Sequence, residues 1–183
     1  MKKTLLALLV GSTLISGAAL AEERGSYFDR VEARYVDLED YEPDVFGVSG
    51  RMMLNDSFYL TADYYHHSYN SASLDQIMAG VGYKHDLNEQ FAAFIDINGA
   101  YADGSNDYDE SGFALQAGGI YRLNNAIELS ALVRHADLET DTQEFELGAR
   151  WYVADQFSLS ATYLDGFESE VMNGYFIGAA WHF

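Results

Sequence analysis

The chain has 183 residues, of which 29 are acidic and ten are basic, so its formal net charge is −19 at pH 7. This charge excludes a nucleic-acid-binding protein, because phosphate binding requires a basic surface. The 14 Tyr, 11 Phe and two Trp exclude a disordered chain, and the absence of cysteine excludes disulfide and thiol chemistry. The length fits a single domain.

The first 21 residues follow the pattern of a secretory signal peptide. A basic start, MKK, precedes a short apolar region over residues 4–20, and ALA at 19–21 is a small-residue cleavage site. The apolar region is too short and too often interrupted for a membrane anchor. We therefore expect residues 1–21 to be removed and residues 22–183 to form one domain. Loss of Lys2 and Lys3 leaves eight cations against 29 acids, a formal net charge of −21.

A four-fold internal repeat organises the remaining chain. Its copies are LNDSF at 54–58, LNEQF at 87–91, LNNAI at 123–127 and VADQF at 153–157, and their starts lie 33, 36 and 30 residues apart. Each copy places a polar, turn-forming pair between apolar residues, which is typical of a tight hairpin. A solenoid or propeller also produces repeats of this length, but neither explains the signal peptide or the apolar strand at residues 174–183.

Longer, acidic segments alternate with these tight turns. We expect loops over residues 37–44, 68–73, 102–111, 137–142 and 166–170. Four tight turns and five loops delimit ten strands. The predicted strands cover residues 26–36, 45–54, 57–67, 74–86, 90–101, 112–123, 126–136, 143–153, 156–165 and 171–183.

The strands alternate between apolar and polar side chains. In IELSALVR, residues 127–134, every odd-numbered position is apolar, whereas three of the four even-numbered positions are polar. No apolar run approaches the ~20 residues of a spanning helix, so a membrane would be crossed by strands, which requires a closed barrel. The predicted fold is all-β: one antiparallel up-and-down transmembrane barrel with ten strands, short periplasmic turns and longer extracellular loops. Eight strands is the alternative.

Outward-facing aromatic residues form two predicted belts, as expected at the two interfaces of a membrane. The belt near the loops contains Tyr35, Phe46, Tyr64, Tyr101, Phe113, Tyr163 and Tyr175. The belt near the tight turns contains Phe58, Tyr83, Phe91, Tyr121, Trp151, Phe157, Trp181 and Phe183.

The sequence resembles the small outer-membrane β-barrel proteins of Gram-negative bacteria, a group related to the transmembrane domain of outer membrane protein A. The resemblance lies in GYFIGAAWHF at 174–183, DVFGVSGRMMLNDSFYLTADYY at 44–65 and LDQIMAGVGYKHDLNEQF at 74–91. It implies location in the outer membrane, contact with its lipid and lipopolysaccharide, and biogenesis through periplasmic chaperones and the barrel-assembly machinery. It also implies that the assembly signal consists of Tyr175, Ile177, Ala179, Trp181 and Phe183.

Thirteen charged residues are predicted to point into the barrel lumen. They are Arg30, Glu32, Arg34, Arg51, Asp63, Lys84, Asp96, Arg122, Glu128, Arg134, Glu144, Glu146 and Arg150. Charges of both signs in a narrow interior should pair, because a buried unpaired charge is costly. One interpretation is a network that fills and stiffens the barrel, since small barrels are filled by their own side chains. The alternative is a narrow path for ions or small solutes, selected by the charges.

Catalysis and metal binding receive weaker support. His66, His67, Asp63, His135 and Asp137 are expected near the loop ends of their strands, and a serine hydrolase would have to use Ser68, or Ser130 with His135. Residues 103–110, DGSNDYDE, resemble a calcium loop, but position twelve is Ala114 instead of the required glutamate. Weak Ca²⁺ or Mg²⁺ binding by the acidic loops, shared with lipopolysaccharide phosphates, is a hypothesis.

We therefore predict an outer-membrane barrel with a structural or surface-interaction role, with no catalytic residue, metal or cofactor. The sequence does not determine the oligomeric state, and a monomer is favoured. A narrow porin-like channel is the alternative, and a hydrolase at the extracellular rim comes third.

Overall fold

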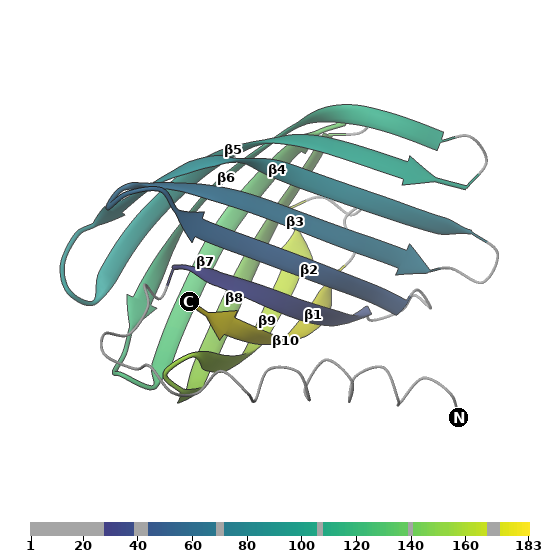
Figure 1. The fold of residues 1–183 in the computed structure, drawn as a ribbon. Helices are drawn as coiled ribbons and strands as arrows, with labels where there is room; N and C mark the ends of the chain where they lie inside the picture. The colour runs from purple at the N-terminus through teal and green to yellow at the C-terminus, as the bar shows by residue number, and fades with distance from the viewer. Residues whose placement is uncertain (1–27, 39–43, 69–71, 106–107, 139–140, 168–172) are drawn as a thin grey trace, which may run out of the picture.

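Ten antiparallel strands close into one barrel in the computed structural model (Figure 1), which describes residues 28–38, 44–68, 72–105, 108–138, 141–167 and 173–183. Each strand pairs with its neighbours in the chain, and β1 pairs with β10 to complete the barrel. The strands are β1 (Arg30–Leu38), β2 (Asp44–Met53), β3 (Phe58–Ser68), β4 (Ser73–Asp86), β5 (Phe91–Gly104), β6 (Tyr108–Arg122), β7 (Ile127–Asp137), β8 (Asp141–Ala154), β9 (Phe157–Gly166) and β10 (Gly174–His182).

This topology confirms the predicted all-β, ten-stranded, up-and-down barrel, and the eight-stranded alternative is wrong. Within the described ranges, no helix is long and apolar enough to cross a membrane. The predicted signal peptide, residues 1–21, lies outside the described residues.

Three of the four tight turns share one set of hydrogen bonds. In the first, the side-chain oxygen of Asn55 accepts the backbone N–H groups of Ser57 and Phe58 at 3.0 and 2.9 Å. Asn88 and Asn124 make the same pair of bonds in their turns, at 2.8 and 2.9 Å. The asparagine therefore satisfies two backbone donors that the strand ladder leaves free, which explains why this residue recurs in the repeat.

The fourth turn is tighter because Ala154 replaces the asparagine. Strand β8 continues to Ala154, which pairs directly with Phe157, so only Asp155 and Gln156 connect the strands. A register shift between Tyr152 and Ala154 accommodates the shorter connection. Alanine has no side-chain oxygen that could accept the backbone N–H groups of a turn. Ala154 therefore pairs with Phe157 in the strand ladder, and the turn is shortened to two residues.

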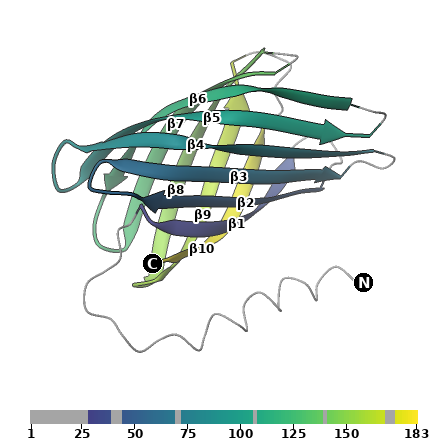
Figure 2. The same ribbon diagram turned by 45° about the horizontal axis from the view of Figure 1, so that its top comes forward.

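The hairpins on the opposite side are longer than predicted. The expected loop over residues 102–111 is wrong, because β5 runs to Gly104 and β6 starts at Tyr108, with Asp103 opposite Asp109. The expected loop over residues 137–142 is likewise shortened by the pairing of Asp137 with Asp141. The acidic composition of these segments predicts loops, but the two-residue alternation of the strands continues through them. Figures 1 and 2 show these hairpins at the end of the barrel opposite the C terminus.

The first strand begins later than predicted. Residues 26–27 are outside the described ranges, and β1 starts at Arg30 instead of residue 26. Phe28 precedes the strand and is fully buried. The Asp29 carboxylate accepts the backbone N–H of Met53 at 2.5 Å, which fixes this segment against the end of β2.

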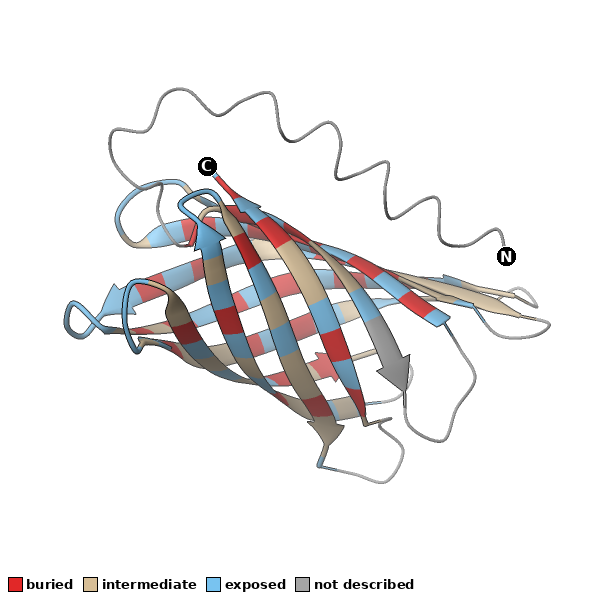
Figure 3. Cartoon of the chain, turned by 90° about the horizontal axis from the view of Figure 1, so that it is seen from below, coloured by how far each residue is buried: buried red, intermediate tan, exposed pale blue. Residues whose placement is uncertain are grey.

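The two faces of each strand differ in exposure, and Figure 3 shows the resulting alternation around the barrel. On β10, Tyr175 and Ile177 are 52% and 63% exposed, whereas Phe176 is 7% exposed. The predicted aromatic residues Phe58, Tyr83, Tyr121 and Trp151 are exposed, and Phe91 and Phe157 are partly exposed on the same outward face. Of the residues predicted as an assembly signal, Trp181 and Phe183 are also exposed, and Ala179 is partly exposed.

Candidate functional site in the barrel lumen

The thirteen predicted lumen residues all occupy inward-facing positions of their strands. Arg34, Arg122 and Glu144 are partly buried. The other ten are buried, namely Arg30, Glu32, Arg51, Asp63, Lys84, Asp96, Glu128, Arg134, Glu146 and Arg150. Alternation alone brings them to the interior, because one residue in two on every strand must face the axis.

Glu32 is the centre of the largest group of ion pairs. Its carboxylate accepts hydrogen bonds from Arg150 Nη2 at 2.6 Å and from the Ser160 hydroxyl at 2.5 Å. Arg30 Nε and Arg34 Nη2 each lie 3.5 Å from the same carboxylate. Glu32 is only 1% exposed, so three arginines share one desolvated anion. Arg150 also lies 3.7 Å from Glu128 and donates to Ser158 at 2.8 Å.

Arg134 organises a second group of ion pairs toward the extracellular side. Its guanidinium pairs with Glu144 and Glu146, the latter at 3.0 Å, and donates to the Gln116 side chain at 3.2 Å. Arg34 connects the two groups, because its Nη1 lies 3.7 Å from Glu146 while its Nη2 faces Glu32. The lumen therefore contains one continuous chain of paired charges between β1, β7 and β8.

An aromatic cluster closes the network on the side of the tight turns. Its buried members are Phe28, Tyr59, Phe94 and Ile120. The Arg51 guanidinium carbon lies 5.0 Å from the ring centre of Phe28, 5.7 Å from that of Tyr59 and 4.5 Å from that of Phe94. Tyr59 donates to Asp96 at 2.8 Å. Arg51 is thus held by ring faces, an arrangement that attracts a cation electrostatically.

An apolar cluster closes the network on the extracellular side. Its buried members, each in the extracellular half of its strand, are Val45, Tyr65, Met78, Ala100, Ala114, Ala136, Leu164 and Phe176. The Tyr65 hydroxyl accepts a hydrogen bond from Arg34 at 3.2 Å. The lumen is therefore layered, with an aromatic layer, a charged layer and an apolar layer in order from the periplasm.

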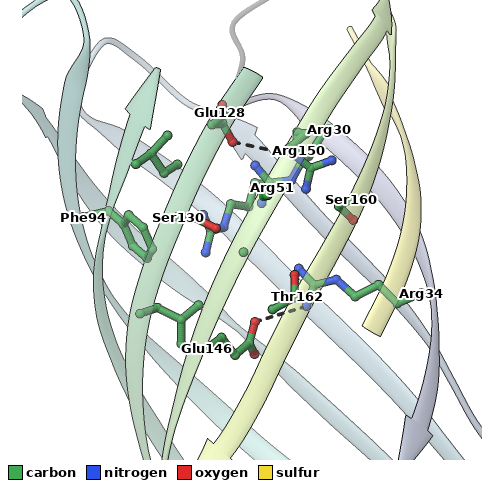
Figure 4. A pocket seen from close by; sticks show the side chains of 14 residues that line it. Arg30, Arg34, Arg51, Phe94, Glu128, Ser130, Glu146, Arg150, Ser160 and Thr162 are labelled. Carbon is green, nitrogen blue, oxygen red and sulfur yellow. Dashed lines mark ion pairs between the residues drawn. The ribbon is translucent and has the colours of Figure 1, made fainter. Parts of the chain in front are cut away.

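The charged layer contains a small cavity, shown in Figure 4. Its volume is about 30 Å³, which has room for one or two water-sized particles. Arginine side chains dominate its polar lining, namely Arg30, Arg34, Arg51 and Arg150, together with Glu128 and Glu146.

The remaining predicted charges lie outside this group. Lys84 pairs with Asp86 at 2.7 Å. Asp96 accepts a hydrogen bond from the Asn98 side chain at 2.6 Å. Asp63 is buried on β3, and Arg122 lies at the periplasmic end of β6, opposite Glu128.

Several residues of the interior were missed by the sequence analysis. Alternation indicates that Tyr59, Gln116, Ser158 and His182 face inward, but it contains no information on which residues meet across the lumen. Ser158 hydrogen-bonds to His182 at 2.8 Å, and Tyr152 donates to Glu128 at 2.9 Å. Phe28 precedes the first strand, so no alternating pattern could have assigned it to the interior.

The residues considered for catalysis do not all converge. Asp63 and His67 occupy inward positions, whereas His66 occupies an outward one, so they lie on opposite faces of β3. Ser130 and His135 also occupy opposite faces of β7. Asp75 accepts a hydrogen bond from Tyr64 at 2.6 Å and contacts His66 Nδ1 at 2.8 Å.

The segment considered as a calcium loop forms part of the β5–β6 hairpin, apart from residues 106–107, which are not described. In the part of the chain that the structure describes, no three His, Asp or Glu side chains are grouped so as to hold a metal ion.

The model of the outer membrane protein beta-barrel domain family matches residues 5–164. The chain belongs to this family. The protein is accordingly an outer-membrane β-barrel of a Gram-negative bacterium, as predicted.

Solved barrels with a similar fold include porins and channels. A KdgM porin in complex with disordered oligogalacturonate has a TM-score of 0.54 and 9% identity, covering 84% of this chain and 99% of the porin. An outer membrane channel from Pseudomonas putida F1 has a TM-score of 0.55 and 11% identity, covering 91% and 98%. At these identities the likeness is one of fold. No curated protein sequence matches this member of the family significantly.

Proposed function

We propose that this outer-membrane barrel is closed to ions and has a structural or surface-interaction role without a catalytic step. The observation that carries the proposal is the layered lumen. A network of paired charges lies between an aromatic cluster and an apolar cluster, and the cavity within it has room for one or two water-sized particles.

Conduction through this lumen would require rearrangement of several contacts at once. An ion passing the charged layer would separate Arg150 from Glu32 or Arg134 from Glu146, which are buried pairs. Breaking a buried pair typically costs about 3–5 kcal/mol. The ion would then meet the apolar cluster around Met78 and Phe176, whose mostly hydrocarbon side chains replace little of its hydration.

The outer surface supports contact with the membrane as the main interaction. Exposed aromatic side chains such as Trp151 and Tyr175 lie at the two ends of the outward faces, where they suit the interfaces between lipid and water. We propose outer-membrane lipid and lipopolysaccharide as neighbours of a monomeric barrel. The apolar outward face of β10 supports chaperones and the barrel-assembly machinery as partners during biogenesis.

Single-channel recording of the refolded protein in a planar bilayer tests the closed lumen. We expect no steady openings from the unaltered protein, and brief or steady openings from Glu146→Ala, because this change removes a partner shared by Arg134 and Arg34. Leu147→Ala, on the outward face of the same strand, is the matched control and should stay silent. Steady, ion-selective openings of the unaltered protein would contradict the proposal.

A narrow anion-selective channel is the second candidate. It is favoured by the four arginines around the cavity and agrees with the fold shared with the KdgM porin. In this case the unaltered protein conducts, and Arg51→Ala shifts its ion selectivity toward cations. The same recordings therefore separate the two candidates.

A further inference from the structure

We infer that the cavity in the charged layer is a binding site for one small monovalent anion of the halide class. This inference goes beyond the closed-barrel role and does not depend on whether the lumen conducts. Figure 4 shows the cavity with arginine side chains from β1, β2 and β8 directed toward it.

The first observation is a convergence of like charges. Arg30 and Arg51 stand directly opposite each other in the pairing of β1 with β2. Directly opposed like charges destabilise a sheet, and here both side chains are buried and line the same cavity as Arg150. The sequence thus places three cations where their mutual repulsion is least screened by water.

The second observation is that the carboxylates at the cavity are already engaged. Glu128 accepts from Tyr152 at 2.9 Å and faces Arg150. Glu146 pairs with Arg134 and with Arg34. Glu32 is likewise shared by Arg30, Arg34 and Arg150. Within the described part of the chain, these three acids therefore leave the Arg51 charge without a carboxylate partner.

The third observation is the state of these two guanidinium groups. Arg30 is 94% buried, and among the described residues its Nη1 has no hydrogen-bond partner, while its Nε lies 3.5 Å from the Glu32 carboxylate without forming a hydrogen bond. Arg51 forms no ion pair with any carboxylate in the described ranges, and its neighbours are the rings of Phe28, Tyr59 and Phe94. Buried polar groups in proteins are nearly always hydrogen-bonded, so the Arg30 donors indicate a bound acceptor, and the Arg51 charge beside them indicates that this acceptor is an anion.

The size and lining of the cavity define the ligand. A cavity with room for one or two water-sized particles can hold a chloride or bromide ion. The hydroxyls of Ser130 and Thr162 also line the cavity and can donate to an anion. A metal cation is excluded by the surrounding arginines.

Thermal unfolding in detergent micelles, with chloride exchanged for gluconate at equal ionic strength, tests the inference. A ligand that binds only the folded state raises the unfolding temperature by mass action, so we expect a rise with chloride that saturates. Arg51→Met keeps the contacts with the aromatic rings but removes the charge, and should abolish the dependence on chloride. An unfolding temperature that is the same in chloride and gluconate would overturn the inference.

Lys84→Met is the matched control for this variant. Lys84 is a buried cation near the same Phe28 ring, at 5.9 Å, but does not line the cavity. The unfolding temperature of the Lys84→Met variant should rise with chloride as much as that of the unaltered protein. Equal loss in both variants would show general charge screening and overturn the inference.

Anomalous scattering from crystals of the unaltered protein grown in bromide avoids dependence on a variant that fails to fold. The inference requires a peak inside the cavity between Arg30 and Arg51. Water alone in the cavity, or bromide found only as an adventitious ion on the surface, would rule the site out.

Discussion

Glu32 is the residue on which the charged layer depends most. Its carboxylate, 1% exposed, is within 3.5 Å of Arg30, Arg34 and Arg150. A desolvated charge of this kind contributes most when every partner is present, because removal of one member leaves the others uncompensated. Alternation in the sequence predicted that Glu32 faces inward. It could not predict these partners, because contact across a lumen depends on the stagger of strands that lie far apart in the chain.

Glu32→Gln should lower the free energy of unfolding by about 3–5 kcal/mol, because three buried arginines lose their shared counter-charge. Urea titration of the protein in lipid vesicles measures the change. Glu144→Gln is the control, since Glu144 is partly exposed and Arg134 keeps Glu146. We expect a smaller loss for the control, because Arg134 keeps a buried partner. Equal losses in the two variants would disprove the central role of Glu32.

At the scale of elements, turns and faces were predictable and strand ends were not. The repeat around Asn55, Asn88 and Asn124 marks the turns because the side chain itself makes the turn hydrogen bonds. The β5–β6 hairpin is longer than the sequence predicts, because acidic residues such as Asp103 and Asp109 are typical of loops. Asp103 and Asp109 nevertheless pair with each other. The end of a strand that lies in water therefore keeps its backbone pairing, although its outward side chains change from apolar to acidic.

Asn88→Ala should destabilise the protein by about 1 kcal/mol, because the N–H groups of Gln90 and Phe91 lose their acceptor in the turn. Glu89→Ala changes an exposed residue of the same turn and should have little effect. The urea concentration at the midpoint of unfolding measures the difference in stability when the dependence of the unfolding free energy on urea is the same in both variants. A larger effect of Glu89→Ala than of Asn88→Ala would contradict the assigned turn geometry.

At the scale of the whole molecule, the barrel was predictable because one physical constraint governs every strand. Side chains such as Leu129 and Ile177 face lipid, and their chain neighbours face the lumen. A sequence pattern with a period of two therefore indicates which residues lie on each surface. The order of layers inside the lumen was not predictable. The pattern gives the face of a residue but not its height along the axis, which the stagger of the closed barrel determines.

Ala131→Arg tests the lipid face. Ala131 is exposed on the outward face near the middle of β7, where an arginine in hydrocarbon should cost roughly 2–4 kcal/mol. Asp137→Arg, at the extracellular end of the same face, should cost only about 0–1 kcal/mol. Equilibrium unfolding from vesicles distinguishes the two depths. Equal effects at both positions would show that the outward face has been assigned incorrectly.

The pairing of β1 with β10 also has a consequence for the order of events during folding. Arg30 lies opposite His182 at this seam, and Glu32 on β1 bonds to Arg150 and Ser160, which are 118 and 128 residues away. Contacts between such distant parts of a chain carry the largest loop-closure cost and tend to form late. The ion pairs around Glu32 therefore form only when β1 pairs with β10 and the barrel closes. Once formed, they oppose the reopening of this seam.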